Sequence, residues 1–109
     1  MIIKNEEREK EMENNIYQAL VNSIKSNPRN IQSTKRRLWS YYKVEHGKIV
    51  VSSGTMTNHN SKISTPRTLN ESEAEIVYRM WKKGVPSQEI TAITVNSSYW
   101  FALFEDILG

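Results

Sequence analysis

The feature that most constrains the fold is the pattern of helix-ending and helix-starting residues in 69–108, the last third of the chain. Asn70 followed by Glu73 is a capping-box arrangement, in which two side chains satisfy free N–H groups at the start of a helix. Gly84 provides the left-handed residue that commonly follows a helix end. Two further capping positions come after the glycine: Ser87 for a second helix, and Asn96 or Ser97 for a third helix over residues 98–108. The spacing predicts three helices joined by turns of only a few residues.

Apolar residues at helical spacing support these three helices. In the first, Ile76, Val77, Met80 and Trp81 form one face, and in the second Ile90 and Ile93 are expected to point inward. The third helix is apolar on nearly every side, so it lies at the centre of the fold or contacts a second chain. The residues expected at such a dimer or partner interface are Trp100, Phe101, Phe104 and Leu108.

The first element is predicted to be a helix over residues 5–26. Met12, Ile16, Leu20 and Ile24 recur every four residues and form one apolar stripe. Asn27-Pro28 ends the helix, because proline restricts the residue before it.

The middle of the chain has two interpretations. Ser33 or Thr34 caps a second helix running to Lys43, or the same residues form a strand. A turn at Gly47 leads into a strand over 48–52. Residues 53–68 are a linker, or the tip and return strand of a hairpin in which Ile63 pairs toward Val50.

The expected fold is therefore mainly α. It has an N-terminal helix, a basic segment with a possible short β-hairpin, and a C-terminal three-helix unit that resembles a helix-turn-helix. The expected segments are 1–53, 54–68 and 69–109.

The positive charge of the chain is concentrated in its middle. Residues 25–61 contain seven Lys and Arg side chains and one Glu, although the net charge of the 109 residues is only +3. Such a local excess is typical of a surface that binds an acidic partner. The expected phosphate contacts in this segment are Arg29, Lys35, Arg36, Arg37 and Lys43.

Aromatic residues lie among these cations. Trp39, Tyr41 and Tyr42 belong to the core, or they stack on unpaired bases, which would favour single-stranded nucleic acid or RNA as the ligand.

The stretch "LNESEAEIVYRMWKKGVPSQEITAITVNSSYWFALFEDIL", Leu69 to Leu108, resembles the helix-turn-helix of phage and mobile-element regulators and of resolvase-type DNA-binding domains. The residues that carry the resemblance are Leu69, Glu73, Ile76, Lys83, Gly84, Val85, Ser87, Glu89, Ile90, Val95, Ser97 and Ser98. The resemblance implies a transcriptional regulator that binds double-stranded DNA as a homodimer. It also implies phosphate contacts from Lys82 and Lys83, and base readout from Asn96, Ser97, Ser98 and Tyr99.

The alternative function is that of a modulator that binds a host or phage protein through the apolar last helix. That helix carries no Lys or Arg and ends with Glu105 and Asp106, which favours this alternative.

Enzymatic function is not expected. His46 and His59 lie thirteen residues apart, and neither is at metal-ligand spacing from another ligand type. No phosphate-binding glycine loop or nucleophile motif occurs, so neither a metal nor a cofactor is predicted.

The expected location is the cytoplasm. The chain has no cysteine, and its longest apolar run, Tyr99 to Phe104, is too short to span a membrane. The N-terminal residues become highly charged after three positions and lack the apolar centre of a signal peptide.

Overall fold

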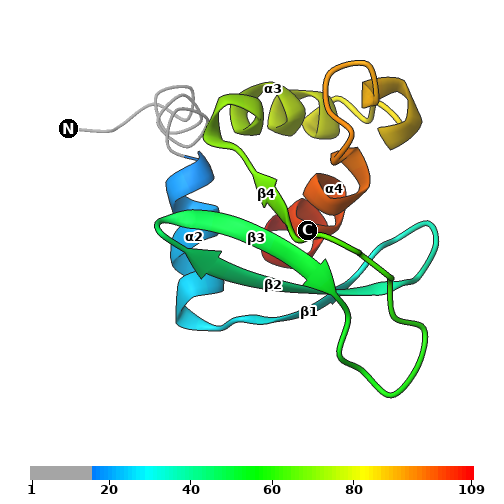
Figure 1. Cartoon of the computed structure of the whole chain (residues 1–109). Coiled ribbons are helices and arrows are strands. Elements are labelled where there is room, and N and C mark those ends of the chain that lie inside the picture. The colour runs from blue at the N-terminus through cyan, green and yellow to red at the C-terminus, as the bar shows by residue number, and fades with distance from the viewer. Residues whose placement is uncertain (1–15) are drawn as a thin grey trace.

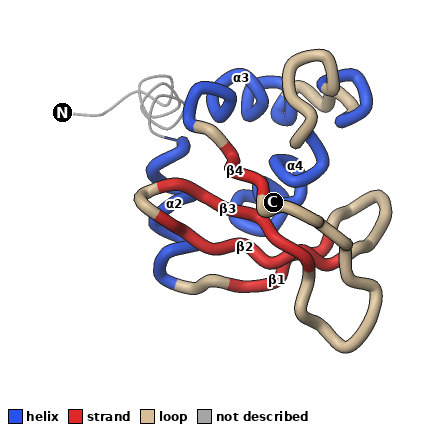
Figure 2. The backbone as a smooth tube through the Cα atoms, in the orientation of Figure 1, coloured by secondary structure: helices blue, strands red, loops and turns tan. Residues whose placement is uncertain are grey.

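The computed structural model describes residues 16–109. They form a four-stranded antiparallel sheet in the order β1-β2-β3-β4, with helices packed against one of its faces (Figures 1 and 2). The elements are α2 (Ile16–Ser26), β1 (Arg29–Gln32), β2 (Trp39–Glu45), β3 (Lys48–Ser53), β4 (Arg67–Leu69), α3 (Glu71–Lys82), the 3-10 helix η1 (Ser87–Ile90) and α4 (Ser97–Leu108).

The apolar stripe of α2 lies in the core, which confirms this part of the predicted first helix. Leu20 and Ile24 are fully buried. The helix ends at Ser26, as predicted. The Asn27 N–H still donates to the Ser23 carbonyl (3.2 Å), and Pro28 follows directly. The expected earlier turns, from residue 5 and including Met12, lie outside the described residues.

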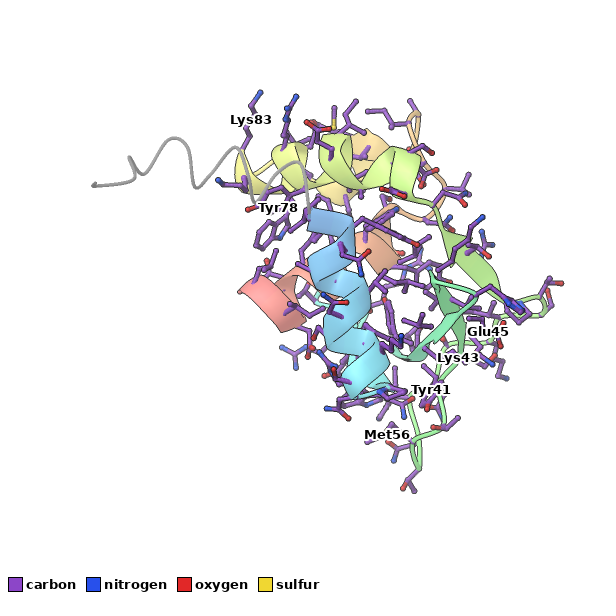
Figure 3. The ribbon with its side chains drawn as sticks, turned by 90° about the vertical axis from the view of Figure 1, so that its left-hand side faces the viewer. Tyr41, Lys43, Glu45, Met56, Tyr78 and Lys83 are labelled. Atoms are coloured by element: carbon purple, nitrogen blue, oxygen red, sulfur yellow. The ribbon has the colours of Figure 1, made fainter. Side chains whose placement is uncertain are left out.

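The segment after Ser33 is a turn followed by the strand β2, so the strand interpretation is confirmed from Trp39 onward and the helix interpretation is wrong. Along β2 the side chains alternate between the two faces of the sheet. Ser40 and Tyr42 are buried against the helices, whereas Tyr41 and Lys43 lie on the outer face, where Figure 3 labels them. This period of two buries alternate residues, which a helix over the same residues could not do.

The strand predicted after Gly47 is confirmed as β3, and Gly47 has the left-handed backbone (φ 76°) that the turn requires. The return strand is β4, not the segment around Ile63. Val50 pairs with Thr68, while the Ile63 N–H donates to Ser53 Oγ (2.7 Å). Residues 54–66 carry no alternating apolar pattern, so the sequence does not indicate which residues return to the sheet.

The first and third C-terminal helices are confirmed, and Gly84 follows the end of α3 with φ 78°. The expected capping box does not form. Asn70 makes no side-chain hydrogen bond to the helix. The Glu73 carboxylate instead accepts from Thr94 Oγ1 (2.9 Å) and Trp100 Nε1 (3.1 Å), because a half-buried carboxylate is a strong acceptor for these donors.

The second predicted helix is a single 3-10 turn. Pro86, not Ser87, occupies its N-cap position. Ile90 is buried as predicted, but Ile93 is 39% exposed because the helix ends at Ile90 and a turn follows.

The expected mainly α fold is therefore wrong, because a four-stranded antiparallel sheet forms one side of the core. Residues from all three expected segments share one hydrophobic core, including Leu20, Tyr42, Ile63 and Trp100. The Trp100 ring of α4 packs on the Tyr17 ring of α2, with centroids 6.2 Å apart, so the C-terminal helices do not form a separate unit. Within residues 16–109, no helix is both long and apolar enough to cross a bilayer.

Candidate anion-binding site

The turn between β1 and β2 presents the central cations. Its ends are held by the Ser33 N–H, which donates to the Leu38 carbonyl (3.0 Å), and by the Arg37 N–H, which donates to the Ser33 carbonyl (3.0 Å). Arg37 adopts a left-handed backbone (φ 55°), and its carbonyl accepts from the Gln32 side chain (2.9 Å). These bonds fix the loop and place Lys35 and Arg36 at its tip.

The side chains of Lys35, Arg36 and Arg37 are exposed, and no acidic side chain of residues 16–109 forms an ion pair with them. Within the described residues, the three charges are therefore available to an external anion. This arrangement fulfils a central requirement of the predicted acidic-partner surface.

A pocket of about 440 Å³ lies beside this turn. Lys35 and Arg36 line one part of it, and Arg67 at the start of β4 lines another. The remaining wall comes from η1 and from the beginning of α4, through Ser97 and Ser98 among others. Figure 1 shows the β1–β2 turn and the chain leading into α4 on the same side of the molecule. The basic segment and the C-terminal helices thus meet at one site.

The first turn of α4 carries no acidic residue of its own to compensate the positive end of the helix dipole. Asn96 at the N-cap makes no side-chain bond to the helix. The N–H groups of Ser97 and Ser98 have no acceptor within the described part of the chain. Glu73 bonds to Thr94 and Trp100 but does not line the pocket. Free N–H groups and an uncompensated dipole favour an anion at this end.

Arg67 connects the sheet to α4. Its guanidinium lies over the Tyr99 ring, 5.9 Å from the centroid, and Nη1 donates to Asn96 Oδ1 (3.4 Å). The sequence did not indicate this residue, since it lies within the polar segment 53–68 that was expected to be a linker or hairpin return. Its only signal was a positive charge without an acidic neighbour in the sequence.

The beginning of α4 is also held from the sheet side. The Tyr42 hydroxyl donates to the Tyr99 carbonyl (2.8 Å). Burial of Tyr42 strongly raises the pKa of its hydroxyl, because the ionised form would lose its hydration. The position of the pocket wall thus depends on a neutral, fully buried tyrosine.

The other expected phosphate contacts do not line the pocket. Arg29 pairs with Asp106 (2.7 Å), and Lys43 pairs with Glu45 (2.6 Å). The Lys82 ammonium lies 5.5 Å from the centroid of the Tyr78 ring, and Lys83 is exposed after α3. Figure 3 shows Lys83 far from Lys43, at opposite sides of the view.

The four residues expected to read bases differ in accessibility. Asn96 is 8% exposed and Ser97 is 4% exposed. Tyr99 is half-buried beside Arg67, and only Ser98 is exposed. Ser97, Ser98 and Tyr99 line the pocket, whereas Asn96 lies behind it, bonded to Arg67.

The residues expected at a dimer or partner interface belong to the core. Trp100 and Phe104 are fully buried and stack on each other with ring centroids 5.7 Å apart. Phe101 and Leu108 are partly buried against the same core. The apolar excess of α4 is explained by contacts with the other helices and the sheet.

Within residues 16–109, no group of three or more His, Asp or Glu side chains is placed to hold a metal ion. The pocket offers ammonium, guanidinium, hydroxyl and N–H donors, which suit an oxyanion. Comparison of the chain with protein-family models, with curated proteins and with solved structures finds no match.

Proposed function

We propose that the protein binds duplex DNA through the face formed by the Lys35–Arg37 turn and the beginning of α4, as a cytoplasmic DNA-binding regulator. One observation carries this proposal: Lys35 and Arg36, which pair with no acidic side chain of residues 16–109, line the same pocket as Ser97 and Ser98, whose N–H groups have no acceptor among those residues. Both features attract negative charge, and the phosphate backbone is the most regular source of negative charge on DNA.

The geometry favours phosphate contacts over base readout. Asn96 and Ser97 are too deeply buried to reach base edges in a groove without rearrangement of the pocket. Affinity is then expected to depend strongly on salt and weakly on DNA sequence, since phosphate contacts carry little sequence information.

The protein-binding alternative loses its main support in this fold. It relied on an exposed apolar helix, but Trp100 and Phe104 have no exposed surface. A second function is therefore not proposed.

Salt titration of binding to a random-sequence duplex tests the proposal. In the double variant Lys35→Ala/Arg36→Ala, the slope of log affinity against log salt should flatten by about 2, because two phosphate contacts are lost. The matched control is Lys82→Ala/Lys83→Ala, which removes the same charge after α3 and away from the pocket. Its slope should remain that of the unmodified protein.

Equal flattening in both double variants would mean that net charge, and not this face, governs binding. Absence of binding to duplex DNA at low salt would refute the proposal. The molecular mass in solution, measured with and without duplex, tests the homodimer that the helix-turn-helix resemblance implies.

A further inference from the structure

The described residues that line the pocket at the beginning of α4 include three cations and no acidic side chain. The helix is twelve residues long and has no acidic residue in its first turn, yet Lys35, Arg36 and Arg67 lie around its N-terminus. Like charges placed together around a positive dipole end repel one another. A bound anion would convert this repulsion into attraction.

Ser97 gives an independent indication of a ligand. Five polar residues are buried in the described part of the chain: Ser40, Ser61, Thr94, Asn96 and Ser97. Ser40 and Ser61 bond to each other (2.7 Å), Thr94 bonds to Glu73, and Asn96 accepts from Arg67. Ser97, which is 4% exposed, is the one of these five whose side chain has no hydrogen-bond partner, and it lines the pocket. No fully buried polar side-chain atom of residues 16–109 lacks a hydrogen-bond partner, so the unbonded Ser97 hydroxyl is accessible from the pocket, where a ligand can accept from it.

The size of the pocket indicates that the ligand is larger than an inorganic anion. Its volume of about 440 Å³ falls within the range of small-molecule sites, roughly 300–1,000 Å³. Leu38 and Val95 add apolar wall beside the cations. Such a pocket has room for a phosphate and for the sugar and base attached to it.

The charge at the site favours a phosphomonoester over a phosphodiester. A monoester carries a charge of about −1.5 to −2 at neutral pH and has three free acceptor oxygens. Three cations, the Ser97 hydroxyl and the N–H groups of α4 provide enough donors for all three oxygens.

We propose that this pocket binds the 5′-phosphate of a nucleotide, with the phosphate at the N-terminus of α4 and Ser97 Oγ, Arg67 and the Lys35–Arg36 pair as its side-chain partners. The nucleotide is either free or the 5′ end of a DNA strand. In the second case the inference deepens the proposed function and rests on it, because the pocket then receives the end of the bound duplex.

Calorimetric titration with a nucleoside 5′-monophosphate, and with the matching nucleoside, tests the pocket without DNA. The monophosphate should bind and the nucleoside should not. Ser97→Ala should weaken monophosphate binding about fivefold, the equivalent of one hydrogen bond. The matched control is Ser72→Ala, which removes a serine from the first turn of α3 and should leave binding unchanged.

Arg36→Ala provides a second variant at a fully exposed turn position, so it tests the pocket even if Ser97→Ala fails to fold. We expect it to weaken monophosphate binding about tenfold, in keeping with loss of a charge-assisted hydrogen bond. If neither the monophosphate nor inorganic phosphate binds at millimolar concentration, or if both Ser97→Ala and Arg36→Ala bind as the unmodified protein does, the inference is refuted.

Duplexes with 5′-phosphate or 5′-hydroxyl ends distinguish the two sources. Tighter binding of the phosphorylated duplex supports a strand end, whereas equal binding of both duplexes together with monophosphate binding supports a free nucleotide. The two proposals can fail separately: a protein that binds the monophosphate but no duplex at low salt loses the proposed function and keeps the pocket.

Discussion

The first turns of α3 and α4 differ in how their positive dipole ends are compensated. Both helices have twelve residues, and both have an asparagine at the N-cap, Asn70 and Asn96, that makes no side-chain bond to its helix. The first turn of α3 contains Glu71 and Glu73, whereas the first turn of α4 contains no acid and lies beside cations. The two helices thus share length and cap residue but differ at their N-termini. The positive dipole end of α3 is compensated by acids in its own first turn, whereas that of α4 attracts an anion.

The two helix ends are also physically connected. Glu73 reaches from α3 to Trp100 of α4 and to Thr94 just before it. The acid at the beginning of one helix thus helps to position the beginning of the other. A change in α3 can alter the pocket without touching any residue that lines it.

The largest expected effect comes from breaking this connection. Glu73→Ala should lower the free energy of unfolding by about 3 kcal/mol, because two donors lose their acceptor, one of them on the buried Trp100 ring. Urea denaturation measures the change. Glu71→Ala, which removes an exposed acid from the same turn, should cost only roughly 0.5 kcal/mol through the helix dipole. Equal losses in the two variants would show that Glu73 acts through the dipole alone.

A smaller effect is expected at the sheet side of α4. Tyr42→Phe should lower the free energy of unfolding by about 1 kcal/mol, since the hydroxyl bond to the Tyr99 carbonyl is lost. Urea denaturation at neutral pH measures this change. Tyr41→Phe, on the outer face of the same strand, is the matched control and should change stability little.

The Tyr42 hydroxyl also predicts a dependence of stability on alkaline pH. Burial raises its pKa above the ordinary value of 10.0, so tyrosine in the unfolded chain ionises first as pH rises. Below pH 10.0 this tyrosine does not change the free energy of unfolding with pH. As the pH rises above that value, the free energy of unfolding falls by about 1.4 kcal/mol per pH unit because of this tyrosine. Denaturation across this range should show a shallower loss in Tyr42→Phe. If the free energy of unfolding falls with pH as steeply in Tyr42→Phe as in the unmodified protein, the Tyr42 hydroxyl is not the group that ionises.

The smallest change in the free energy of unfolding is expected when an acid is added to the first turn of α4, and this change compares the two helix N-termini directly. Ser98→Asp adds an acid to the first turn of α4 at an exposed position and should raise the free energy of unfolding by about 0.5 kcal/mol. The same change should weaken duplex binding, because the new carboxylate competes with phosphate for the N–H groups and cations. The free energy of unfolding, measured by denaturation, should therefore rise, while the affinity for duplex DNA, measured by titration, should fall.

Ser72→Asp adds the same charge to the first turn of α3, where two acids are already present. It should leave DNA binding unchanged. If the Asp variants at Ser98 and Ser72 weaken binding equally, the difference between the two helix ends is not what selects the anion.

The parts of the fold that the sequence predicted are those that depend on neighbouring residues. The end of α2 before Pro28 and the turns at Gly47 and Gly84 were predicted correctly, because each requires a backbone conformation that only a few residue types adopt readily. The segment of β2 was left open between helix and strand because its apolar residues fit both periods, and the three residues of β4 carry no pattern of their own.

The candidate site shows the same division. The cations of the β1–β2 turn were predicted from charge alone, since uncompensated Lys and Arg side chains are visible in the residue order. Arg67 was not, because its place over Tyr99 depends on β4 pairing with β3 and on the packing of α4 against the sheet. The four expected base-reading residues were named from a resemblance, which could not indicate that Asn96 and Ser97 are buried.

The sequence by itself determined the end of α2, the glycine turns after β2 and α3, the apolar stripe of α2 and the concentration of positive charge in the middle of the chain. These features arise from interactions between residues only a few positions apart. The tertiary structure alone decided that four strands pair in one sheet and that Lys35 and Arg36 line the same pocket as Ser97. The reason is that strand pairing and helix packing join residues tens of positions apart, where the burial of the whole core, and no local preference, selects the partner.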